Sequence, residues 1–256
     1  MTLENVYVIP HGDEIISRPN RESSIMHDRI IGLIKDDASD SIAIISPHSL
    51  RLKHHIPLIN TEHLGGRYRI GNKLLKRTFE SDRPLNQRII SSCKNVEEVN
   101  FVTSSGPLSV FPLDFGALIP LSFFRKRKIS LLGQWRDGPR DDLVSFGREL
   151  YHSVEMMPYK ITVIFSADQA HTHDAAGPYG YSSNASHYDK MVIDAISTGN
   201  FIDLKGINDE IIDTAKPDSY WNMLSFYGFT DEAGEKTNFE FYYVQDYFGM
   251  LLAKGS

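Results

Sequence analysis

Residues 161–181 read ITVIFSADQAHTHDAAGPYGY, and this stretch sets the expectation for the whole chain. Its first part, Ile161–Phe165, is an apolar run with the length and composition of a buried strand. Two histidines, His171 and His173, follow in a polar loop with aspartates beside them, and a glycine-proline turn comes next. A strand that leads into a polar loop is where α/β proteins usually keep their chemistry. We therefore expect this loop to form one wall of an active site.

The composition fits one globular domain over residues 1–256. Of the 256 residues, 41% are hydrophobic and 23% are charged, which is enough to bury a substantial core. The net charge of −6 argues against a nucleic-acid-binding protein. No window reaches the ~18–20 apolar residues of a membrane helix, and we expect no signal peptide. The lone Cys93 can form no internal disulfide, which favours a cytoplasmic, reducing setting.

Two further apolar runs are each followed by a proline-histidine pair. Val6–Ile9 is followed by proline and His11, and Ser41–Ile45 leads through a serine and a proline to His48. Parallel strands bring their carboxyl ends to one edge of a sheet, where ligands bind. We therefore expect the two histidines to lie on the same edge as the loop after Phe165.

The remaining segments alternate between helical and extended patterns. This alternation predicts a three-layer α/β fold, with a mostly parallel or mixed core sheet flanked by helices. Helices are expected from Ser23 or Ser24 to 34, within 74–92, over 141–154, over 185–198 with Asn184 as the cap, and from 216–218 to near Gly228. Strands are expected over 99–104, 128–132 and 238–244, and a hairpin is expected that pairs 56–60 with 67–70 around Gly65-Gly66.

The sequence has no G-x-G-x-x-G, Walker A, G-x-S-x-G or H-E-x-x-H motif. The remaining candidates for the chemistry are therefore the histidines and acidic residues at the strand ends. Imidazole and carboxylate groups together suit divalent iron, zinc or manganese. His11 and His48 are the best ligand candidates, since both follow proline at a strand end. His171 and His173 could act as acid or base or as ligands, because imidazole titrates near neutral pH. His187, at a helix start, could support the site.

Several short motifs, taken in their order along the chain, give the sequence a family resemblance. The chain resembles the class III extradiol ring-cleavage dioxygenases, the LigB-like superfamily that also includes Memo-like proteins. The resemblance covers most of the chain, and the order of the motifs carries more weight than any one of them. They are Val8-Ile9-Pro10-His11-Gly12, Ile45-Ser46-Pro47-His48, Asp114-Phe115-Gly116, the loop through Asp168 and His171, and Tyr188-Asp189.

The resemblance implies Fe(II) held by His11, His48 and a carboxylate, with Zn(II) as the alternative metal. It also implies that His171 is the acid/base that acts on the substrate. For the carboxylate, Asp218 and Glu240 compete. In the relatives the acidic ligand opens a helix about ten residues before a small residue, and Asp218 stands ten residues before a glycine. This spacing favours Asp218 over Glu240.

Two residues depart from the pattern of the family. Phe115 stands where many ring-cleaving relatives have a histidine that meets the substrate hydroxyl, and an aspartate replaces the usual glutamate ligand. Phe115, His173, Tyr179, Tyr181 and His187 are expected to line the substrate pocket or to support the site.

The activity that the resemblance implies is extradiol cleavage of a small catechol-like or aminophenol-like aromatic by O2. The alternatives are a Memo-like metal-binding protein without ring cleavage, a zinc-dependent hydrolase or lyase on the same scaffold, and a metal-free structural relative. Related enzymes often assemble from several copies, so a homo-oligomer is expected.

Overall fold

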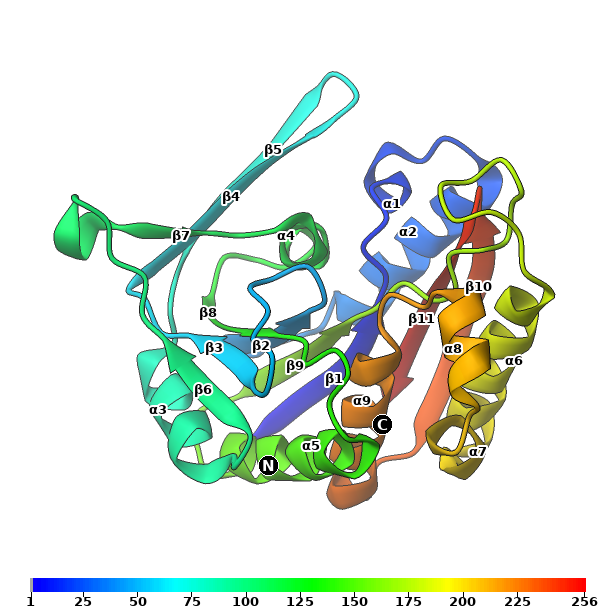
Figure 1. Cartoon of the computed structure of the whole chain (residues 1–256). Helices are drawn as coiled ribbons and strands as arrows, with labels where there is room; N and C mark the ends of the chain where they lie inside the picture. Colours follow the sequence, from blue (N-terminus) through cyan, green and yellow to red (C-terminus); the bar gives the residue numbers. More distant parts are fainter. Residues whose placement is uncertain (1) are drawn as a thin grey trace.

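The computed structural model describes residues 2–256, and it shows an α/β fold built on one large sheet (Figure 1). Four adjacent strands at its middle are parallel, namely β1 (Leu3–Ile9), β9 (Ile161–Ser166), β2 (Ser41–Ser46) and β8 (Lys128–Gly133). The outer strands are β11 (Phe248–Gly255) and β10 (Thr237–Gln245) on one side, and β3 (Ile56–Ile59) and β6 (Val96–Val99) on the other. The pairings of β1 with β11 and of β8 with β3 are antiparallel. The predicted α/β class with a mixed core sheet is confirmed.

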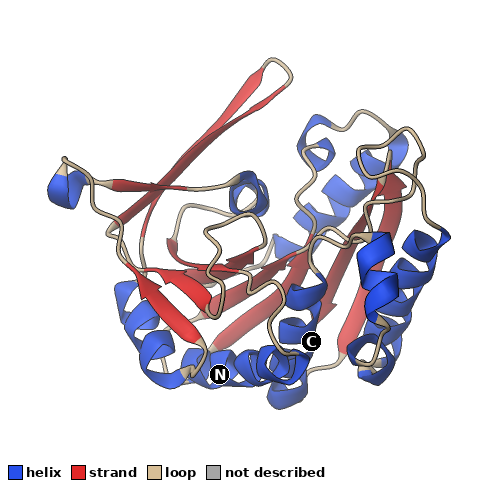
Figure 2. Ribbon diagram, in the orientation of Figure 1, coloured by secondary structure: helices blue, strands red, loops and turns tan. Residues whose placement is uncertain are grey.

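Helices cover both faces of the sheet, which explains why β2 and β9 are buried at every residue instead of at alternate ones (Figure 2). One face packs against α2 (Arg21–Ile34) and α4 (Phe115–Ser122). The other packs against α3 (Arg83–Ser92), α5 (Arg140–Glu155), α6 (Ser183–Thr198) and α9 (Tyr220–Ala233). The three short helices are α1 (Glu14–Ser17), α7 (Ile202–Lys205) and α8 (Asp209–Ala215). No helix among the described residues is long and apolar enough to cross a membrane.

A second, smaller sheet carries a hairpin that extends away from the body (Figure 1). It consists of β5 (Lys73–Glu80), β4 (His63–Ile70) and β7 (Val110–Pro112). The predicted hairpin around Gly65-Gly66 is therefore wrong, because residues 56–59 join the large sheet and the turn lies at Gly71, whose φ is +54°. Gly66 lies inside a strand instead, where a Cβ would come within 2.8 Å of the Leu113 carbonyl oxygen.

Other expected boundaries also shift. The first half of the helix expected within 74–92 is β5, and α3 begins only after Asp82, whose side chain accepts from the Leu85 N–H at 3.2 Å. Pro84 then falls in the first turn, where a missing N–H is tolerated. The strand expected over 99–104 lies at 96–99.

Helix caps are the least accurate part of the prediction. Asn20 caps α2, and Ser23 completes the capping box by bonding back to the Asn20 N–H. Ser182, not Asn184, caps α6. The helix that was expected to end near Gly228 continues to Ala233.

Gly228 lies inside α9 because this helix crosses α5 at very short range. A Cβ on Gly228 would lie 1.9 Å from the Val144 carbonyl oxygen, and one on Gly147 would lie 2.1 Å from that of Ser225. Two glycines therefore let the helix backbones touch. The crossing fixes α9, and the segment just before α9 carries Asp218.

Replacing Gly228 by alanine should force the two helices apart. We expect Gly228→Ala to lower the free energy of unfolding by about 1–3 kcal/mol, the usual cost of overpacking. Urea unfolding measures this change. The matched control is Gly32→Ala on α2, where a Cβ meets nothing within 4 Å. It should raise the free energy of unfolding by up to about 1 kcal/mol, because alanine favours helix. Equal effects of the two changes would contradict the close crossing.

Candidate metal centre

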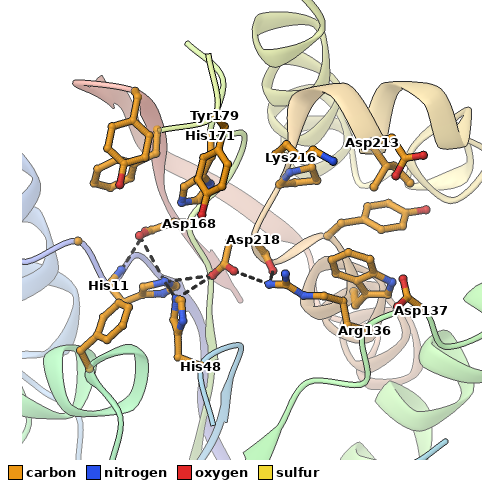
Figure 3. A pocket seen from close by; sticks show the side chains of 18 of the residues that line it. His11, His48, Arg136, Asp137, Asp168, His171, Tyr179, Asp213, Lys216 and Asp218 are labelled. Carbon is orange, nitrogen blue, oxygen red and sulfur yellow. Dashed lines mark hydrogen bonds and ion pairs between the residues drawn. The ribbon is translucent and has the colours of Figure 1, made fainter. Parts of the chain in front are cut away.

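Two histidines and one aspartate meet at the carboxyl-end edge of the parallel strands. His11 follows β1 and His48 follows β2, and their Nε2 atoms lie 3.1 Å apart although β9 runs between the two strands. Asp218 Oδ2 lies 3.3 Å from His11 Nε2 and 3.2 Å from His48 Nε2 (Figure 3). One ligand atom from each of the three residues lies within 4.8 Å of the others. The structure therefore brings together the three residues that the sequence indicated as ligands.

The hydrogen bonds of His11 determine which of its ring nitrogens is free. Ser166 Oγ donates its hydrogen to the Gly116 carbonyl at 2.6 Å, so it can only accept from His11 Nδ1, which lies 2.9 Å away. Nδ1 therefore carries the proton, and the lone pair of Nε2 points toward His48 and Asp218. A metal-binding histidine is usually oriented in this way, by a hydrogen bond from its other nitrogen.

The donor set fits a divalent metal ion. The Nε2 lone pair of His11 faces a carboxylate oxygen of Asp218 and, at 3.4 Å, one of Asp168. His11 is 1% exposed and Asp168 is 3% exposed, so water screens these groups little. Electron-rich atoms this close need a shared proton or a cation between them. Nitrogen and oxygen donors of this kind suit iron, zinc or manganese.

The charges of the site follow from the same contacts. Burial raises the pKa of Asp218, but hydrogen bonds and charge from His11 and His48 outweigh it and hold that pKa well below the usual range. Burial lowers the pKa of His11, but the Asp168 and Asp218 carboxylates outweigh it and raise that pKa above 6.5. The metal-free site therefore holds an ionised Asp218 beside the His11 imidazole. The raised pKa means that this ring tends to hold a second proton, on Nε2, in addition to the one on Nδ1.

His171 lies on the opposite wall of the same cavity (Figure 3). Its Nδ1 lies 2.7 Å from the Gln169 carbonyl oxygen, which can only accept a hydrogen bond. Nδ1 therefore carries a proton, and Nε2 of the neutral ring keeps a free lone pair. The ring stacks on Phe248, with ring centroids 5.4 Å apart and an angle of 17° between the planes. This packing fixes the ring, so Nε2 can act as a base at a defined place.

His173 points away from the cavity and anchors the loop. Its Nε2 donates to Asp189 Oδ2 at 2.7 Å, and the Tyr242 hydroxyl donates to the same oxygen at 2.5 Å. Asp189 Oδ1 accepts from the Ala170 N–H at 2.9 Å. This buried cluster ties the loop to α6 and β10. The role of Asp189 was not foreseen, because it depends on partners that are distant in the sequence.

The other expected pocket residues divide into two groups. The Phe115 ring packs on that of His48, with centroids 4.1 Å apart, and Tyr179 also lines the cavity. Tyr181, which is 64% exposed, and His187 lie on the surface. Glu240, the rival ligand, lies on β10, where both its carboxylate and its carbonyl face Arg29. Tyr181 and His187 were expected to line the pocket or to support the site, and neither is among the residues that line the cavity.

The cavity is large enough for a single-ring aromatic compound. Its volume is about 860 Å³, within the range of small-molecule sites. Aromatic side chains lie among the polar ones on its walls, and they are Tyr68, Phe115, Tyr179, Tyr220, Trp221, Tyr247 and Phe248.

Arg136 also lines the cavity, although no motif in the sequence singles it out. Its Nη2 donates to Asp218 Oδ1 at 2.5 Å. The available signal was its place three residues after the end of β8, on the same sheet edge as His11 and His48.

Comparisons with known proteins find a family model, a curated relative and a solved structure that are similar to this chain. The family model of the catalytic LigB subunit of aromatic ring-opening dioxygenase matches residues 6–250. Protein CA_C1420 of Clostridium acetobutylicum is 25% identical over an alignment of 222 residues that covers 78% of this chain and 46% of that protein, so the chain spans about half the length of this curated relative. The crystal structure of the uncharacterized protein JW3007 from Escherichia coli K12 shares the fold, with a TM-score of 0.71 and 15% identity over 98% of this chain and 99% of that one.

The two candidate carboxylates can be separated by substitution. We expect Asp218→Ala to abolish tight binding of one divalent ion per chain, because it removes the only oxygen that faces both imidazoles among the described residues. The matched change Glu240→Ala should leave the stoichiometry at one. Titration of the metal-free protein with Zn(II) or Co(II), followed by calorimetry, measures both. Loss of binding in Glu240→Ala alone would contradict the assignment.

Metal affinity should rise with pH. Below the raised pKa of His11 a proton occupies the imidazole and must leave before a metal binds, so competition should persist above pH 6.5. One displaced proton changes the apparent affinity by about tenfold per pH unit. Asp218 adds nothing to the pH dependence of metal affinity near neutrality, because its lowered pKa keeps the carboxylate ionised there. Competition with a chelator from about pH 5.5 to 8 tests this, and a flat affinity would contradict it.

Proposed function

Because the chain belongs to the family of the catalytic LigB subunit of aromatic ring-opening dioxygenases, we propose that it is a non-haem Fe(II)-dependent extradiol dioxygenase. The substrate class is a catechol-like or aminophenol-like aromatic, with O2 as the second substrate. One observation carries the proposal. Two imidazole nitrogens and one carboxylate oxygen converge in a cavity whose opposite wall holds the free Nε2 of His171.

The donor set supports iron but does not single it out, since the same ligands also hold zinc. Bound Fe(II) would supply open coordination positions and the redox chemistry that dioxygen requires. His11, His48 and Asp218 would hold it. His11 and His48 come from strand ends and Asp218 from the segment before α9, and their ligand atoms lie within 4.8 Å of one another.

The protein's own part in the reaction is to orient the ring and to move a proton. His171 Nε2 accepts the proton of a phenolic hydroxyl, because the hydrogen bond at Nδ1 leaves Nε2 as the basic nitrogen. Phe248 keeps the His171 ring in place, and Phe115 packs against the imidazole of His48. The aromatic walls of the cavity suit a flat substrate.

Phe115 favours a second candidate function, a metal-binding protein of this fold that does not cleave rings. Its side chain packs on His48 and offers no hydrogen bond to a substrate hydroxyl. A substrate would then depend for its polar contacts on the metal and on other groups of the cavity, among them His171 and Arg136.

Oxygen uptake distinguishes the two candidates. We expect the Fe(II)-loaded protein to consume O2 with at least one member of a panel of catechols and aminophenols, with a coloured ring-opened product. His171→Gln should lower kcat by about 10²–10⁴-fold, the usual contribution of a positioned acid/base, while iron content stays the same. His187→Gln, which changes an exposed histidine on α6, serves as the control and should keep full activity. Bound iron with no uptake for any compound would contradict ring cleavage and favour the second candidate.

A further inference from the structure

The two carboxylate oxygens of Asp218 have different partners. Oδ2 faces the Nε2 atoms of His11 and His48 at 3.3 and 3.2 Å. Oδ1 accepts a hydrogen bond from Arg136 Nη2 at 2.5 Å (Figure 3). One oxygen is therefore directed at the proposed metal position, and the other is engaged by a cation.

Arg136 is itself held in place. It belongs to the loop that follows β8, and its guanidinium lies over the Trp221 ring, with Cζ 5.2 Å from the ring centroid. The same Nη2 also donates to the Asp218 carbonyl oxygen at 3.0 Å. The arginine side chain is 29% exposed and lines the same cavity as Asp218.

The main chain of Asp218 has supports that do not involve Arg136. Gln134 Nε2 donates to its carbonyl oxygen at 3.0 Å, and its N–H donates to the Gln169 carbonyl at 3.3 Å. Removal of the guanidinium would therefore leave the residue in place and free the carboxylate. Arg136 acts on the orientation and the charge of the carboxylate more than on the path of the chain.

A carboxylate can bind a cation through one oxygen or through both. A charge-assisted hydrogen bond to one oxygen is short and strong, and that oxygen cannot turn to the metal without losing it. Aspartate has few side-chain torsions, so rotation that brings Oδ1 toward the imidazoles would carry it away from Arg136. The positive charge of the guanidinium also offsets part of the negative charge of the carboxylate.

We propose that Arg136 is a positioning residue that restricts Asp218 to single-oxygen coordination of the metal ion. The inference rests on the proposed metal-dependent function, and it deepens that proposal by assigning a task to a residue outside the ligand set. A carboxylate that binds through one oxygen leaves one more coordination position open on the cavity side. Arg136 thereby keeps space at the metal for the substrate.

Arg51 offers a matched control for the effect of charge alone. Its guanidinium is near enough to feel the charges of Arg136 and Asp218, but its hydrogen bond is to the Pro47 carbonyl at 3.4 Å. If Arg136 acted only by its positive charge, loss of Arg51 would produce a similar change at the metal. If Arg136 acts by engaging Oδ1, only loss of Arg136 changes the coordination.

The experiment uses the full-length protein loaded with Co(II), whose visible bands lose intensity as its coordination number rises. We would compare the wild type with Arg136→Met, Arg136→Lys and Arg51→Met by visible spectroscopy and by X-ray absorption at the cobalt edge. Arg136→Leu repeats the test should the methionine variant fold poorly, and circular dichroism checks each fold. The readout is the number of nitrogen and oxygen neighbours of the metal, which does not depend on catalytic activity.

We expect Arg136→Met to gain one oxygen neighbour at cobalt and to lose visible intensity. Arg136→Lys should return toward the wild-type spectrum, because its ammonium group can donate to Oδ1, and Arg51→Met should match the wild type. The same coordination number and spectrum in wild type and in folded, cobalt-loaded Arg136→Met or Arg136→Leu would overturn the inference. A matching change in Arg51→Met would also overturn it. Failure of the wild type to bind Co(II) would instead contradict the proposed metal-dependent function.

Discussion

The structure depends on the meeting of two imidazole nitrogens, one from the buried His11 and one from the partly buried His48, with one carboxylate oxygen at the edge of the central sheet. The Nε2 atoms of His11 and His48 lie 3.1 Å apart, and Asp218 Oδ2 lies within 3.3 Å of both. Away from water such groups are unfavourable together unless a cation or a proton joins them. Much of the surrounding structure is arranged to hold these three groups in place, from Ser166 behind His11 to Arg136 behind Asp218.

Strand β9 and the loop after it organise most of the site. Ser166 at the end of the strand sets the tautomer of His11, and Asp168 accepts the main-chain N–H of His11. The loop then presents His171 to the cavity and uses His173 to fasten itself to Asp189. One segment thus supports the first ligand, supplies the proposed base and carries its own anchor. Asp218 is positioned by a different part of the chain, namely α9 and its close crossing with α5.

Local pattern was enough to predict the parts of this arrangement that depend on strands. The apolar runs before His11 and His48 and at 161–165 are the adjacent parallel strands, and the strand-end rule placed their polar residues on one edge. Asp218 needed the family resemblance, because nothing local distinguishes it from other acids before helices. Glycine pairs misled the prediction: Gly65-Gly66 resembles a turn, but its glycines permit close packing inside a strand. The partners of Arg136 and Asp189 are set by the tertiary structure, and no local pattern reveals them.

The central claim is that His11, His48 and Asp218 bind one metal ion. Anomalous diffraction at the iron edge, from crystals soaked anaerobically in Fe(II), tests it most directly. We predict one strong peak per chain at about 2.0–2.2 Å from His11 Nε2, His48 Nε2 and Asp218 Oδ2, the usual range for such ligands. A peak next to other residues would contradict the claim, and so would the absence of any peak after the Fe(II) soak.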